Sequence, residues 1–124
     1  MPHNPAFSQA VVTEGKGKTI YIGGQNAVTR QQAIVGEGDL FVQTEQALHN
    51  IHTLLKTCNA DWNNVVKMTI YIVQGQDVMM GYRAAQKAMN GMTEPPAISV
   101  LIVAALGNPA FLVEIEAVAF VPES

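Results

Sequence analysis

The most apolar part of the chain is its last quarter, where two long runs contain few polar residues. Ile98 to Leu106 is apolar except for Ser99, and Phe111 to Val121 is apolar except for Glu114 and Glu116. Because Pro-Pro and Gly-Asn-Pro bound these runs, they predict two strands of about nine to eleven residues. Such strands are expected to be covered on both faces, which would place the two glutamates in the most hydrophobic part of the protein.

Two earlier segments have apolar residues at helical spacing. Behind Asp39, a good N-cap residue, the apolar positions of Leu40 to Cys58 predict an amphipathic helix that ends near Thr57 to Asn59. Asp77 is placed to cap a second helix, which is predicted to stop at Asn90-Gly91. The residues expected along one side of this second helix are Val78, Tyr82, Ala85 and Met89.

The remaining periodic segments predict strands. Residues 8–12 and 19–23 are separated by a polar turn and predict a hairpin, and residues 33–35 could add one short strand. Residues 65–73, VVKMTIYIV, predict a β-branched strand. Its predicted core-facing residues are Val66, Met68, Ile70 and Ile72. The element order predicts an α+β domain over residues 1–124, with one mixed sheet and both helices on one of its faces.

Composition adds an expectation about assembly. Charged residues make up 14% of the 124 residues and apolar residues 48%, whereas an average domain has about 25% charged residues. A small monomer has too much surface to cover with so few charges, so part of the apolar surface is expected to contact other subunits. The net charge of -3 and the lack of a Lys/Arg cluster argue against a nucleic-acid-binding face.

The sequence also argues against a disulfide, a metal site and a cofactor site. Cys58 is the single cysteine, which excludes an internal disulfide and a cysteine-based metal site. His49 and His52 lie on the first predicted helix among charged residues, which favours a solvated stripe over a zinc site. No cofactor motif is evident, and the absence of a signal or membrane-spanning pattern leads us to expect a cytoplasmic protein without membrane partners.

Spaced matches over nearly the whole chain identify a family resemblance. The matching segments are Phe7-Ser8-Gln9-Ala10, Gly24-Gln25, Ile34-Val35-Gly36, Gln43-Thr44 to Asn50, Asp61 to Lys67, Pro96-Ala97, Val103 to Leu106, and Val113 to Ala117. Through them the chain resembles the RidA (YjgF, formerly endoribonuclease L-PSP) family. The resemblance implies a chorismate-mutase-like fold and a homotrimer whose three sheets form a central barrel, with ligand clefts between adjacent subunits.

The best-known activity of this family is the hydrolysis of reactive enamines and imines to 2-oxo acids and ammonia. In active members an arginine directly after the Pro-Ala of the penultimate strand grips the substrate carboxylate in a bidentate manner. Ile98 occupies that position here, and an isoleucine side chain cannot pair with a carboxylate. The resemblance therefore implies a divergent member that lacks the usual substrate anchor.

Other expected cleft positions also differ from the residues that are common in the RidA family. Phe7 stands where a tyrosine is common, Gly23 where a serine is common, and Tyr82 where an asparagine is frequent, whereas Glu114 and Gly24 are retained. This shift predicts a more apolar pocket, with Glu114 as a hydrogen-bonding partner or general base. The full set of expected ligand-binding residues is Phe7, Gly23, Gly24, Gln25, Tyr82, Ile98 and Val100.

Three functions remain open at this point. The leading one is binding of a small, largely apolar or aromatic metabolite in clefts between subunits. The second is enamine or imine hydrolysis by Glu114 with a different carboxylate anchor, for which Arg83 is the candidate. The third is a structural or interaction trimer, in which Glu114 and Glu116 only satisfy hydrogen-bond donors at a subunit interface.

Overall fold

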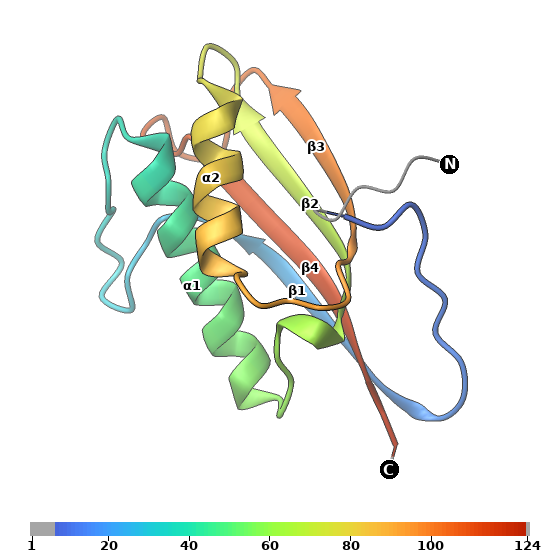
Figure 1. The fold of residues 1–124 in the computed structure, drawn as a ribbon. Coiled ribbons are helices and arrows are strands. Elements are labelled where there is room, and N and C mark those ends of the chain that lie inside the picture. The colour runs from blue at the N-terminus through green and yellow to red at the C-terminus, as the bar shows by residue number, and fades with distance from the viewer. Residues whose placement is uncertain (1–6, 124) are drawn as a thin grey trace.

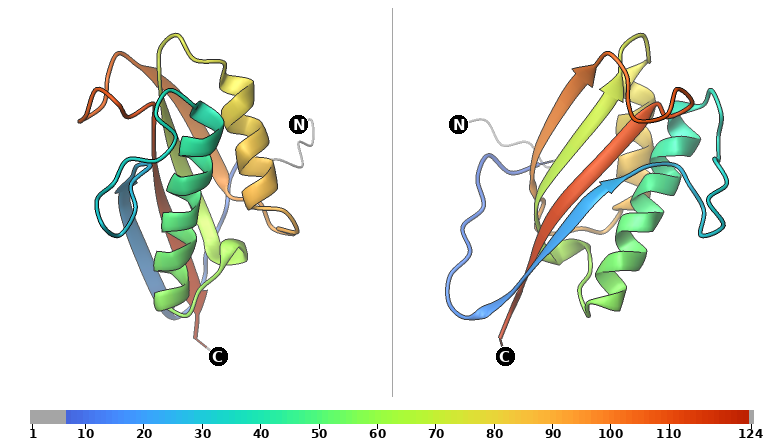
Figure 2. Two further views of the ribbon diagram at one scale, coloured as in Figure 1. Left: turned by 90° about the vertical axis from the view of Figure 1, so that its left-hand side faces the viewer. Right: turned by 180° about the vertical axis from the view of Figure 1, so that it is seen from behind.

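The computed structural model describes residues 7–123, which form one mixed sheet with two helices packed on one of its faces (Figures 1 and 2). The elements are β1 (Gly17–Gln25), α1 (Leu40–Thr57), the 3-10 helix η1 (Trp62–Asn64), β2 (Val65–Val73), α2 (Val78–Ala88), β3 (Ala97–Val103) and β4 (Val113–Pro122). The strand order is β1-β4-β2-β3, with β2 and β3 parallel and the other pairs antiparallel. The predicted α+β architecture is therefore confirmed.

Helix α1 begins and ends where its sequence predicts. Asp39 is the N-cap, and its Oδ1 accepts a hydrogen bond of 3.1 Å from the Val42 amide. The helix ends at Thr57 with Cys58 as the C-cap. Its buried residues recur every three or four positions and pack against the sheet, because that spacing places them on one face of an α-helix.

Helix α2 is capped as predicted but covers the sheet only in part. The Asp77 carboxylate accepts a hydrogen bond of 3.0 Å from the Met79 amide, and the helix ends at Ala88, just before the predicted Asn90-Gly91 stop. Its buried residues are the small Gly81, Ala84 and Ala85. Three larger apolar side chains of α2, Val78, Met79 and Tyr82, remain 42–47% exposed, whereas Met80 packs against the core.

The predicted N-terminal hairpin is wrong. Residues 8–12 form no strand, and β1 begins at Gly17 and pairs with β4. Ser8 instead makes one bridge to Ala97 of β3, and its backbone N–H donates to the Pro96 carbonyl at 2.8 Å. This contact holds the chain around Ser8 at the β3 edge of the sheet. The chain then loops across to the opposite edge, where it forms β1 (Figure 1).

Three smaller expectations also need correction. Residues 33–35 contribute one isolated bridge, between Val28 and Ile34, and no strand. An irregularity between Val65 and Lys67 in the pairing of β2 with β4 makes Val65 the core residue at that level, while Val66 is half-buried. The strand β3 has seven residues, shorter than predicted, and Val100 and Ile102 on this edge strand are 55% and 56% exposed.

A polar cluster joins the C-terminal end of α1 to η1. Asp61 caps η1 by accepting a 2.8 Å hydrogen bond from the Trp62 amide, and its carboxylate also contacts His52 Nε2 at 2.8 Å and Lys56 Nζ at 3.1 Å. The His52 and Trp62 rings stack with centroids 5.1 Å apart. His52 thus supports the C-terminal end of α1 through its contacts with Asp61 and Trp62.

The Asp61 cluster predicts an acid-dependent loss of stability. The Trp62 N–H, followed by His52 and Lys56, lowers the pKa of Asp61 from 3.8 to about 2. A carboxyl group whose pKa is lower in the folded state stabilises the fold above its unfolded pKa and loses that effect as the pH falls towards the folded value. We expect the free energy of unfolding, measured in urea, to decline between about pH 4 and pH 2.

Asp61→Asn is expected to reduce this decline, because the amide does not titrate. Glu37→Gln, which also neutralises one carboxylate but at an exposed loop residue, is the matched control and should keep the wild-type slope. An unchanged pH slope in Asp61→Asn would show that Asp61 is not the source of the effect.

Candidate functional site

The predicted site residues lie in two groups on opposite faces of the sheet. Phe7, Tyr82, Ile98 and Val100 line a groove on the helix side, between α2 and β3. Glu114 lies on the helix-free face of β4, beside Gly23, Gly24 and Gln25 at the end of β1. One copy of the chain therefore does not bring the predicted residues into one cleft.

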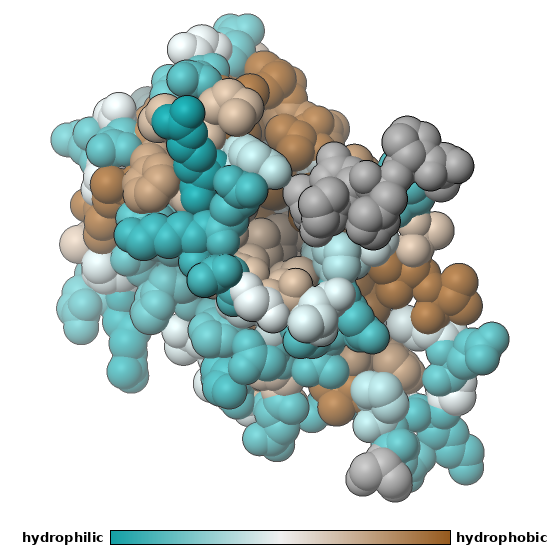
Figure 3. All heavy atoms as spheres, in the orientation of Figure 1, coloured by the Kyte–Doolittle hydropathy of each residue, from teal (hydrophilic) through white to brown (hydrophobic). Residues whose placement is uncertain are grey.

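The groove between α2 and β3 is large and apolar. It has a volume of about 820 Å³, within the range of roughly 300–1,000 Å³ typical of small-molecule sites. None of the described residues that line it carries a charged side chain. Figure 3 shows hydrophobic surface gathered over β3, where this groove opens. Sequence analysis did not include three methionines that also line it, Met79, Met89 and Met92.

Two polar groups of α2 lie along the groove. The Tyr82 hydroxyl accepts a hydrogen bond of 3.2 Å from Gln86 Nε2, which leaves the Tyr82 O–H available as a donor. Arg83 follows Tyr82 directly but is not among the described residues that line the groove. Within a single chain, therefore, Arg83 does not supply the carboxylate anchor that one hypothesis requires.

Glu114 is positioned by the alternation of side chains along β4. Its neighbours Val113 and Ile115 are completely buried on the helix side, so Glu114 projects from the opposite face. Its Oε1 accepts a hydrogen bond of 3.3 Å from Asn26 Nδ2. A Cβ atom on Gly24 would lie 2.5 Å from Glu114 Oε2, so the carboxylate rests directly on the glycine backbone.

Asn26 is the main residue of this site that sequence analysis missed. Its side-chain amide also donates to the Val113 carbonyl at 3.2 Å, and its own carbonyl accepts a hydrogen bond of 3.0 Å from Asn50 Nδ2. Gln46 donates in turn to Asn50 Oδ1 at 2.9 Å. A chain of amides thus connects α1 to the Glu114 carboxylate. In the sequence, the feature that could have pointed to Asn26 is its position directly after Gly-Gly-Gln.

Glu116 is held differently from Glu114. The Tyr71 hydroxyl donates a 2.9 Å hydrogen bond to Glu116 Oε1, and this bond raises the pKa of Tyr71 above its usual value. Glu116 thus satisfies a side-chain donor within its own chain, whereas the hypothesis from sequence placed that donor at a subunit interface.

Comparison with known proteins assigns the family. The family model described as endoribonuclease L-PSP matches residues 1–121. The chain belongs to the endoribonuclease L-PSP family. A similar L-PSP relative, the RutC family protein slr0709 of Synechocystis sp., is 34% identical over 94% of this chain and 86% of its own length. Another, the mouse 2-iminobutanoate/2-iminopropanoate deaminase, is 34% identical over 91% of this chain and 79% of its own length.

Solved structures agree with the L-PSP assignment. The structure of YyfB from Yersinia pestis, a protein of the conserved Rid family, superposes with a TM-score of 0.82 and 35% identity. It matches over 94% of this chain and 87% of the YyfB chain. The predicted chorismate-mutase-like fold is confirmed, and no helix of the described L-PSP chain is long and apolar enough to cross a membrane.

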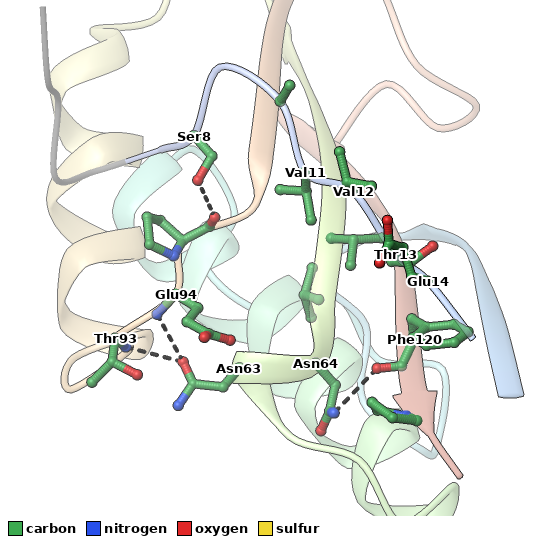
Figure 4. A pocket seen from close by; sticks show the side chains of 15 residues that line it. Ser8, Val11, Val12, Thr13, Glu14, Asn63, Asn64, Thr93, Glu94 and Phe120 are labelled. Atoms are coloured by element: carbon green, nitrogen blue, oxygen red, sulfur yellow. Dashed lines mark hydrogen bonds between the residues drawn. The ribbon is translucent and has the colours of Figure 1, made fainter. Parts of the chain in front are cut away.

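A second hollow of this L-PSP chain is less suited to bind a ligand. It has a volume of about 600 Å³ and lies between residues 8–14 and the start of β2 (Figure 4). Two of its polar side chains serve the fold, since Asn63 accepts from the Thr93 and Glu94 amides and Asn64 donates to the Phe120 carbonyl. These groups hold loops together, whereas the Glu114 carboxylate lies open on a glycine.

Gly24 offers a direct test of how Glu114 is held. We expect Gly24→Ala to turn the Glu114 side chain away, because the new Cβ would lie within 2.9 Å of its Cγ, Cδ and Oε2 atoms. The hydrogen bond to Asn26 should then be lost, which is measured as a shift of the Asn26 side-chain amide resonances in NMR spectra. Gly23→Ala is the matched control, because nothing lies within 4 Å of a Cβ at that position. Unmoved resonances in Gly24→Ala would contradict this arrangement.

Proposed function

We propose that this chain forms a cytoplasmic homotrimer whose intersubunit clefts bind a small, largely apolar or aromatic metabolite. In each cleft the groove of one copy, with Phe7, Tyr82, Ile98 and Val100, faces Glu114 of the next copy. The separation of these groups within one chain supports this proposal, because only a second copy can place the carboxylate near the groove.

The uncharged groove around Ile98 is the observation that carries the proposal. A site for a 2-imino acid needs a cation for the substrate carboxylate, as the arginine of active RidA members provides. Here Ile98 shares the groove with apolar neighbours such as Met89 and Val100, and none of the described lining residues is charged. Apolar lining with a few polar groups such as Tyr82 suits a ligand with an apolar body.

Exposed apolar residues support the assembly part of the proposal. Val100, Leu101 and Ile102 of β3 are 55%, 43% and 56% exposed in a single chain, and alternate residues project from opposite faces of this edge strand. Their burial against another copy would be favourable by about 25 cal/mol per Å² of apolar surface removed from water. This fits the low charged fraction of 14%.

Hydrolysis of an enamine or imine is the second candidate function. The observation that favours it is the similarity to the mouse protein named 2-iminobutanoate/2-iminopropanoate deaminase. Glu114 would act as the general base that activates water, and its carboxylate is held for such a role by Asn26. The weakness of this candidate is that none of the described residues lining the groove is a cation.

An assay with freshly generated 2-aminoacrylate separates the two functions, with sedimentation velocity to establish the oligomeric state. The binding proposal predicts a trimer with little turnover and saturable binding of 2-phenylethanol, observed by ligand-detected NMR and weakened by Ile98→Asp. Rapid turnover that is abolished by Glu114→Ala would replace it with the deaminase function. A trimer that neither binds the alcohol nor turns over 2-aminoacrylate would favour a structural or interaction role.

A further inference from the structure

We infer that the cleft selects ligands that carry a protonated nitrogen on an apolar body and have no carboxylate. Glu114 is the counter-charge for that nitrogen, and Asn26 is the positioning residue that holds Glu114 in place. The inference rests on the proposed function, because Glu114 and the groove must come from adjacent copies to contact one ligand. It goes further by specifying the charge of the ligand.

The first argument is the charge balance of the site. The three ion pairs among residues 7–123 use the acids Asp61 and Glu45, and none of them includes Glu114. None of the described residues that line the groove is charged. Contact between copies would remove water from an anion that has no counter-ion, which is unfavourable. A ligand carboxylate would add a second negative charge, whereas a protonated nitrogen would neutralise the first.

The second argument is the way in which Glu114 is held. Asn26 contacts one carboxylate oxygen, Oε1, at 3.3 Å through a neutral amide. An amide donor orients the carboxylate but leaves its negative charge uncompensated, in contrast to a lysine or an arginine. The other oxygen, Oε2, rests against Gly24 and accepts no hydrogen bond from residues 7–123. Glu114 therefore keeps an oxygen available for an N–H donor of the ligand.

The third argument is the rigidity of this support. Asn50 Nδ2 donates to the carbonyls of both Asn26 and Val28, at 3.0 and 2.9 Å, and so fixes the backbone that carries the Asn26 amide. Asn50 projects from α1, an element with a buried face in the core. A carboxylate oriented by an amide on a fixed backbone loses less conformational freedom when a ligand binds, which favours affinity.

The test compares three probes with a common phenyl ring: 2-phenylethylamine, 2-phenylethanol and 3-phenylpropanoate. At pH 7 the alkylamine is a cation, the alcohol is neutral and the acid is an anion. Titration calorimetry on the full chain should show the amine binding about tenfold more tightly than the alcohol, since a charge-assisted contact is stronger than a neutral one. The acid should bind more weakly than the alcohol.

Two substitutions assign the preference to named residues. Glu114→Gln should make the amine and the alcohol bind equally, because it removes the charge and keeps the shape. Asn26→Ala should weaken the amine about threefold and leave the affinity for the alcohol unchanged, a split that general damage to the fold would not produce.

The outcomes distinguish this inference from the function on which it rests. If the alcohol binds and the amine binds no better, or if the acid binds best, the inference is wrong and the apolar cleft stands. Survival of the amine preference in Glu114→Gln would also overturn it. If none of the three probes binds to the assembled protein, both the proposed binding function and the inference fail.

Discussion

Replacing Ile98 by arginine is expected to raise kcat/KM for 2-iminobutanoate by about tenfold to a hundredfold. A hydrogen bond to a charged group contributes roughly 1.5–3 kcal/mol, and each 1.4 kcal/mol is about a factor of ten. Ile98 is half-buried in the wall of a groove of about 820 Å³, so the longer side chain has room to reach a ligand. Turnover is measured by coupling 2-oxobutanoate formation to a reductase.

The gain should appear mainly as a lower KM, because an arginine on the substrate carboxylate strengthens binding before and during the reaction alike. Ile98→Lys is the matched control: it adds the same charge without the bidentate geometry and should give a smaller gain. Ile98→Arg should also reduce the affinity for 2-phenylethylamine. If Ile98→Arg changes neither the deaminase activity nor the amine affinity, the role assigned to Ile98 is incorrect.

The sequence predicted the elements whose periodicity is set by one buried face. Both helices follow their Asp caps, at Asp39 and Asp77, and β2 has the predicted bounds of Val65 to Val73. The hairpin prediction failed because the local strand pattern of residues 8–12 was outweighed by a contact with a distant part of the chain. Ser8 bonds to Pro95 and Pro96, 87 or more positions away, and no local pattern encodes such a contact.

The candidate site shows the same limit more clearly. The alternation along β4 already indicates that Glu114 and Val113 point in opposite directions. The face on which each lies relative to Ile98 depends on the strand order, which puts β4 in the interior of the sheet and β3 at its edge. Asn26 could not be found from spacing, because it contacts Glu114 across 88 positions.

Gln43→Ala is expected to lower the free energy of unfolding by about 2–6 kcal/mol. Gln43 is completely buried, and its amide makes three hydrogen bonds, two to the segment before β4 and one to the loop before α1. Nε2 donates to the carbonyls of Gly36 and Ala110, and Oε1 accepts from the Leu112 amide at 2.9 Å. Truncation leaves the Ala110 carbonyl and the Leu112 amide without this partner, whereas the Gly36 carbonyl still accepts from the Asp39 amide. Each unpaired buried group costs about 1–3 kcal/mol.

Urea denaturation followed by the fluorescence of Trp62, the single tryptophan, measures this loss. Thr44→Val is the matched control at the next position, since Thr44 is also buried but its hydroxyl donates only to the Leu40 carbonyl within α1. That carbonyl can keep its backbone bond in the helix, so Thr44→Val should cost less than about 1.5 kcal/mol. Because Gln43 fixes the loop that leads into β4, its loss should also release Glu114 and broaden the Asn26 side-chain amide resonances. A cost for Gln43→Ala no larger than that for Thr44→Val would show that the loop before β4 is held by other contacts.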